Sequence, residues 1–202
     1  MSKIRNIILA ISLILLCLAF VTYASESIGL LKNVPVEGYD IARAFGMQVL
    51  KFEFSLPDGQ YDIDCWVEGW SKGAKEPLRL TMGKSQIKEV FSKGNIIISI
   101  LDVATNNEDK DKNIKITISK EYIHKGKQVH IDSYSIIVEN PLYGLSNSGS
   151  ETYSKEPIKL DKDINLFTIL GDKTRIEETS SLEEAVAIHD KVLVFKVKFT
   201  KK

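Results

Sequence analysis

The sequence predicts an all-β sandwich of about eight or nine short strands, immunoglobulin-like or jelly-roll-like in topology, with one late α-helix. Apolar and polar residues alternate along most of the chain, which is the period of a strand with one buried face. Turn-forming residues separate these runs at short intervals, as they do in all-β domains. The clearest helical spacing of apolar residues lies close to the C-terminal end.

Residues 1–24 are expected to be a secretory signal peptide or an N-terminal anchor. Lys3 and Arg5 precede an apolar run over 7–21, and small residues follow up to Ala24. That order is typical of a secretory signal. The run is shorter than the ~20 residues of a membrane-spanning helix, which favours cleavage after Ala24. The protein is therefore expected outside the cytoplasm, secreted or associated with the cell envelope, and membrane-anchored only if this segment is retained.

Residues 25–202 suit a single domain with a sizeable core. The full chain carries 27 basic and 27 acidic residues, so it has no net basic charge that would favour nucleic acid. Cys65 is the only cysteine after residue 24, which excludes an intrachain disulfide in the mature chain. Because Cys65 shares the apolar face of an alternating segment with Tyr61, Ile63 and Val67, it is expected to be a small core residue.

Residues 51–67 are expected to form two strands joined by a hairpin turn. Phe52, Phe54 and Leu56 alternate with polar residues. The Pro-Asp-Gly sequence at 57–59 then combines three turn formers. In the strand that follows, one apolar face is formed by Tyr61, Ile63, Cys65 and Val67.

The middle of the chain predicts further strands over 78–82, 96–103, 114–118, 122–131 and 134–138. The 96–103 strand is apolar on both faces and is expected to be central. The 122–131 segment is expected to be a hairpin around a three-residue loop at 125–127. Residues 140–157 are rich in turn formers and are expected to be a long loop or a hinge.

The C-terminal part predicts strands over 164–170 and 192–199 with the helix between them. Ser181 can cap this helix, and Glu184 can complete a capping box. The face of the helix that packs inward should carry Leu182, Ala185, Val186 and His189. In the last strand the inward residues should be Leu193, Phe195, Val197 and Phe199.

The first candidate ligand-binding site is the outward face of the strand that begins at Tyr61. It carries Asp62, Asp64, Trp66, Glu68 and Trp70. Two flat rings flanked by carboxylates suit stacking on a sugar or on a peptide side chain. The alternative is a strand covered on both faces, with the tryptophans packed under a loop or the helix.

The second candidate is a pair of histidines, His124 and His130, with Asp132. A three-residue loop would put both imidazoles on one face, ~7–8 Å apart at Cα, which suits zinc or copper. The alternative is a solvated outer face. Because no cysteine or third histidine lies nearby, no metal site is predicted.

No catalytic constellation or phosphate-binding motif is found, so no catalytic residue and no cofactor are predicted. The leading hypothesis is an exported, non-catalytic β-sandwich that binds a surface glycan, a peptide or an envelope protein. One alternative is an envelope hydrolase that uses the acids Asp62, Asp64 and Glu68. The other is a membrane-tethered accessory subunit, if residues 1–24 are retained.

Overall fold

The structure is a computed structural model that describes residues 27–36, 47–103, 113–140, 145, 147–152 and 155–202. The predicted signal peptide therefore lies outside the described residues, as do residues 104–112 between two of the strands. No helix within the described ranges is long and apolar enough to cross a membrane.

Within these ranges the chain forms eleven strands and one helix. The strands are β1 (Gly29–Val34), β2 (Met47–Gly59), β3 (Tyr61–Ser71), β4 (Leu78–Gln86), β5 (Phe91–Val103), β6 (Asn113–His124), β7 (Lys127–Glu139), β8 (Asn147–Thr152), β9 (Lys155–Ile158), β10 (Asp163–Asp172) and β11 (Lys191–Lys201). The helix α3 (Leu182–Ile188) lies between the last two strands. The predicted all-β class with one late helix is confirmed.

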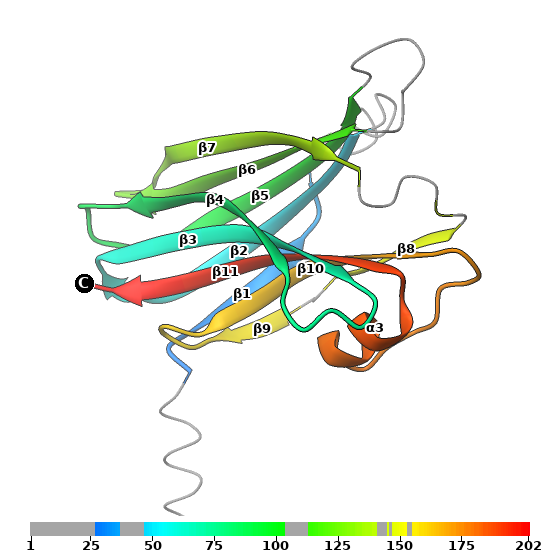
Figure 1. The fold of residues 1–202 in the computed structure, drawn as a ribbon. Coiled ribbons are helices and arrows are strands. Elements are labelled where there is room, and N and C mark those ends of the chain that lie inside the picture. Colours follow the sequence, from blue (N-terminus) through cyan, green and yellow to red (C-terminus); the bar gives the residue numbers. More distant parts are fainter. Residues whose placement is uncertain (1–26, 37–46, 104–112, 141–144, 146, 153–154) are drawn as a thin grey trace, which may run out of the picture.

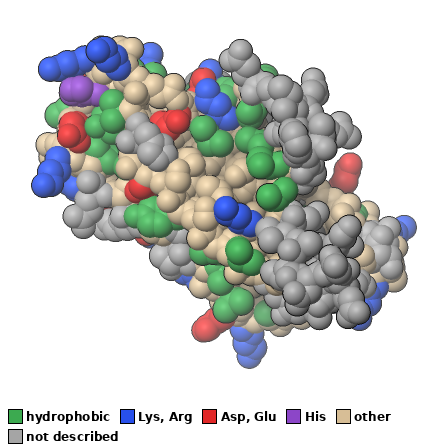
Figure 2. Space-filling view, turned by 90° about the horizontal axis from the view of Figure 1, so that it is seen from above, with side chains coloured by type: hydrophobic (Ala, Val, Ile, Leu, Met, Phe, Trp, Pro, Cys, Tyr) green, Lys and Arg blue, Asp and Glu red, His purple; other side chains and the backbone are tan. Residues whose placement is uncertain are grey.

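The strands form two antiparallel sheets that face each other (Figure 1). The six-stranded sheet has the order β7-β6-β5-β2-β1-β9, and the five-stranded sheet has the order β4-β3-β11-β10-β8. The expected central position of the strand at 96–103 is confirmed, because β5 lies between β6 and β2. Seen from above, basic, acidic and hydrophobic side chains are interspersed over the described surface (Figure 2).

The hydrophobic core fills the space between the two sheets. The inward positions of the last strand are confirmed, since Leu193, Phe195, Val197 and Phe199 are all at most 2% exposed and belong to this core. Cys65 is also fully buried there. An aromatic group lies at one end of the core and comprises Phe54, Tyr61, Phe91, Tyr122 and Phe199.

The connection between β2 and β3 differs from the expected hairpin. β2 pairs with β5 and β1, whereas β3 pairs with β11 and β4. The predicted turn at 57–59 is wrong, because these residues end β2 with an irregular register, and the chain passes from one sheet to the other at Gln60. Both strands have one strongly apolar face, and placing them in opposite sheets lets these faces pack against each other across the core.

Helix α3 begins as the sequence predicts. The Ser181 hydroxyl accepts from the backbone N–H of Glu184, and the Glu184 carboxylate accepts from the backbone N–H and the hydroxyl of Ser180. Ala185 and Val186 are buried against the outer face of the five-stranded sheet, where a second cluster contains Leu170, Val192 and Val194. The helix lies at the opposite end of β11 from the C-terminus (Figure 1).

The segment 140–157, expected to be a long loop, contains two short strands. β8 pairs with β10 at the edge of the five-stranded sheet, and β9 pairs with β1 at the edge of the other sheet. Both are short edge strands made mostly of polar residues, so they show little of the hydrophobic alternation that predicts a strand. Together with β1, which the sequence analysis did not predict, these two strands raise the count above the predicted eight or nine.

Candidate functional site

The outer face of β3 carries the residues of the first candidate site. The two tryptophans on this face differ in their exposure to solvent. Trp66 is fully buried, whereas Trp70 is half-buried and packs against the cluster under α3. The guanidinium carbon of Arg79 lies 4.3 Å from the centroid of the Trp66 ring. The Nζ atom of Lys198 lies 5.8 Å from that ring. Trp66 is thus enclosed by neighbouring side chains.

The carboxylates of this face pair with lysines of the C-terminal strand and the last residue. Glu68 Oε1 accepts from the Trp66 indole N–H at 2.9 Å, and Glu68 Oε2 lies 2.8 Å from Lys196 Nζ. Asp62 Oδ1 lies 2.8 Å from Lys202 Nζ, and Asp64 is half-buried. The ligand-binding role of this face remains a prediction, and its geometry offers no exposed ring surface on Trp66.

The histidine hairpin has a different register from the expected one. Lys125 and Gly126 both have positive φ, at 51° and 74°, which fits a two-residue type I′ turn. His124 is therefore opposite Lys127, and His130 is opposite Glu121. The expected diagonal pairing of the two histidines on one face is wrong, because a two-residue turn shifts the register by one position. Among the described residues no group of three or more His, Cys, Asp or Glu side chains could hold a metal ion.

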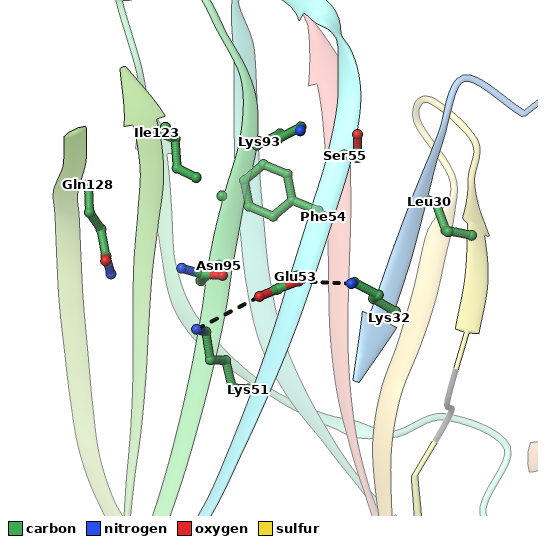
Figure 3. Close-up of a pocket in the computed structure, with 11 residues that line it drawn as sticks. Leu30, Lys32, Lys51, Glu53, Phe54, Ser55, Lys93, Asn95, Ile123 and Gln128 are labelled. Carbon is green, nitrogen blue, oxygen red and sulfur yellow. Dashed lines mark ion pairs between the residues drawn. The ribbon is translucent and has the colours of Figure 1, made fainter. Parts of the chain in front are cut away.

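A groove of about 520 Å³ lies on the outer face of the six-stranded sheet (Figure 3). Its walls come from five neighbouring strands, from β1 with Leu30 and Lys32 at one side to β7 with Gln128 at the other. With neighbouring strands ~4.8 Å apart, the groove spans roughly 19 Å across the sheet. The sequence analysis placed residues 51–55, Ile123 and Gln128 on strands, but it predicted no strand for Leu30, Lys32 or residues 93–95. It also gave no sign that the outward faces of these strands form one hollow.

Three lysines and one glutamate set the charge of the groove. Glu53 Oε2 lies 3.0 Å from Lys32 Nζ, and Glu53 Oε1 lies 3.9 Å from Lys51 Nζ (Figure 3). Within the described part of the chain, Lys93 makes no ion pair. The groove lining therefore has two more positive than negative charges.

Two amide side chains lie in the groove and share one orienting carboxylate. Asn95 Nδ2 donates to Glu121 Oε2 at 3.4 Å, and Gln128 Nε2 donates to the same oxygen. This arrangement leaves each amide with a carbonyl oxygen and a second N–H for other partners. The apolar part of the lining comes from Leu30, Ile123, Phe54 and the aliphatic stems of the lysines.

Gly94 gives the floor of the groove its shape. A Cβ atom at this position would fall 2.4 Å from Phe54 Cζ and 2.2 Å from the Glu121 carbonyl oxygen, both far inside contact distance. Glycine inside a strand often marks such a close approach. Gly94, which lies between Lys93 and Asn95 just before an isoleucine run, is a sequence signal that could have indicated a close approach here.

A third polar site lies beside α3. Asp172 Oδ1 accepts from the backbone N–H of Thr174 at 2.8 Å and from its hydroxyl at 2.7 Å, and these bonds lower the pKa of the Asp172 carboxyl to about 2. His189 is 1% exposed, and its Nε2 lies 3.0 Å from the Glu177 carbonyl oxygen. Since a carbonyl only accepts, Nε2 carries a proton. His189 Nδ1 faces Asp172 Oδ2 at 3.6 Å.

The chain was compared with protein-family models, with curated proteins and with solved structures, and none of the three comparisons found a match.

Proposed function

We propose that this protein is an exported, non-catalytic binding module that holds a segment of an acidic glycan in the groove of the six-stranded sheet. Export is proposed from the signal-like order of residues 1–24. The observation that carries the ligand class is the lining of the groove, which combines an excess of lysines, two oriented amides and an aliphatic floor.

Each part of the lining suits one part of an acidic sugar. Lysine ammonium groups pair with carboxylate or other anionic substituents. Asn95 and Gln128 offer the donors and acceptors that sugar hydroxyls need, and Glu121 fixes their orientation. The aliphatic surface of Leu30 and Ile123 suits the C–H faces of sugar rings.

We prefer the groove to the outer face of β3 as the ligand site because fewer of its charged groups pair with one another. On β3, Glu68 and Asp62 both pair with lysines, and Trp66 is enclosed. In the groove, Lys93 has no ion-pair partner among the described residues. An incoming anion therefore meets at least one cation without displacing a carboxylate.

The first test is the affinity of the full chain for a uronic-acid oligosaccharide, measured by calorimetry beside a neutral oligosaccharide of equal length. Lys93→Glu should weaken binding about tenfold or more, because a hydrogen bond to a charged group contributes ~1.5–3 kcal/mol and 1.4 kcal/mol is a factor of ten. The control is Lys162→Glu, which makes the same charge change at an exposed site outside the groove. Equal affinities for both variants would refute the site.

A second variant separates glycan recognition from attraction to any polyanion. Gln128→Ala should weaken binding of the uronic-acid oligosaccharide, since it removes hydroxyl partners, and should leave binding of polyglutamate unchanged. Equal or tighter binding of polyglutamate to the unaltered protein would replace the glycan with an acidic peptide as the ligand.

A further inference from the structure

Lys120 is a fully buried lysine inside the sandwich. It lies on β6 and is 0% exposed, although lysine is rarely buried without a partner. Its Nζ atom lies 3.2 Å from Oδ1 of Asp132 on β7. The two residues are direct partners in the strand register, so the backbone ladder keeps them together.

The surroundings of this pair are apolar and come from both sheets. Ile63 and Cys65 on β3 are both 0% exposed, and burial raises the pKa of the Cys65 thiol to about 12. Lys120 Nζ donates to the carbonyl oxygen of Gly83 at 3.2 Å and to that of Ile63 at 3.5 Å. The site therefore presents an amine to a carboxyl group with little solvent around the amine.

A hydroxyl from the opposite sheet holds the other oxygen of the carboxyl group. Ser85 on β4 is 3% exposed, and its Oγ donates to Asp132 Oδ2. The two oxygens of Asp132 therefore have different surroundings. Oδ2 is fixed by Ser85, and Oδ1 faces the lysine amine.

We propose that Lys120 and Asp132 condense to form an amide bond between neighbouring strands. A proton passes from the ammonium group to the carboxylate, which gives a neutral amine and a carboxylic acid. The Nζ lone pair attacks Cγ of Asp132, and the Nζ–Cγ bond forms while the Ser85 hydroxyl stabilises the negative charge on Oδ2. The Cγ–Oδ1 bond then breaks, and Oδ1 leaves as water with one proton from the acid and one from Nζ. No oxidant or other reactant is needed, and the net charge is unchanged.

The product keeps the hydrogen bonds that surround the pair. The amide carbonyl retains the bond from Ser85, and the amide N–H retains the Gly83 carbonyl. Two buried charges are replaced by one neutral, hydrogen-bonded amide, which removes the desolvation cost of a buried ion pair. The side chain of Asp132 is 21% exposed, which gives the released water a way out.

Mass spectrometry of the full chain tests this bond. After the N-terminus has been read from the terminal peptide, the intact mass should be lower than the sequence mass by one water molecule. A tryptic digest should contain a branched peptide that joins Lys120 to Asp132. An intact mass equal to the sequence mass, with linear peptides only in fresh and aged samples, would overturn the proposal.

Three variants connect the mass loss to this site. Lys120→Met removes the amine while keeping an unbranched apolar chain, and it should restore the full mass. Ser85→Ala should leave a larger fraction of uncondensed chain at equal times. Lys196→Met is the matched control, because it removes the nearly buried lysine that pairs with Glu68. That variant should still lose one water.

Discussion

Several polar side chains of this molecule form hydrogen bonds and ion pairs with neighbouring side chains. Glu68 shows this most clearly, since one of its oxygens accepts from Trp66 and the other pairs with Lys196. Substituting one partner of such a buried pair leaves an uncompensated charge and destabilises the fold. Lys93 is in the opposite situation, and this contrast is why the groove is the preferred ligand site.

Asp172 gives a prediction about acid stability. The hydrogen bonds from Thr174 hold its pKa near 2 in the folded state, below the ordinary value of 3.8. The group therefore stabilises the fold above pH 3.8, and this contribution is lost as the pH falls towards 2. Chemical denaturation between pH 5 and pH 2 should show a steeper loss of unfolding free energy in the unaltered chain than in Asp172→Asn.

The control for this measurement is Glu178→Gln, which neutralises an exposed carboxylate in the connection between β10 and α3. Its acid profile should match that of the unaltered chain. Identical profiles for Asp172→Asn and the unaltered chain would show that the Thr174 bonds do not persist in solution.

Trp66 and Lys120 show which features of a buried residue can be predicted from the sequence. Period two correctly put Trp66 on the face opposite Cys65, but alternation cannot tell what covers an outer face. Lys120 continues the inward stripe of Ile114, Ile116 and Ile118, so its position inside the sandwich was visible in the same pattern. The contact of Ser85 with Asp132, the ion-pair partner of Lys120, was not visible, because Ser85 comes from the other sheet.

Among the elements, most strands were predictable, but β1, β8 and β9 were not, and neither were the partners of most strands. The alternation in β2 and β3 located both strands, yet their partners depend on contacts distant in sequence. The β6–β7 hairpin was located too, but its loop length was wrong. Lys125 adopts positive φ, which non-glycine residues seldom do, and this shortens the loop to two residues.

Helix α3 supports a prediction at this scale. Ser181→Ala removes the hydroxyl that accepts from the Glu184 backbone N–H, so the unfolding free energy should fall by ~1 kcal/mol. Chemical denaturation followed by circular dichroism measures this change. Ser181→Asp, which can also cap, should retain most of the stability. A loss of equal size in both variants would contradict a capping role.

For the whole molecule, the two sheets have different outer faces. The five-stranded sheet is partly covered by α3 and by ion-paired side chains, whereas the six-stranded sheet carries the open groove. Sequence reading gave the sandwich because one apolar face per strand requires a second layer. It missed the groove because a hollow arises from the relative placement of five strands, which no single strand encodes.

The most direct test of the central claim is a map of backbone amide chemical-shift changes on titration with the uronic-acid oligosaccharide. The account predicts that the largest changes fall on the groove strands, at Lys32, Glu53, Lys93, Asn95 and Gln128. The amides of β3 around Trp66 should change little. Changes centred on Trp66 and Trp70, with the groove unaffected, would contradict the account and move the binding site to β3.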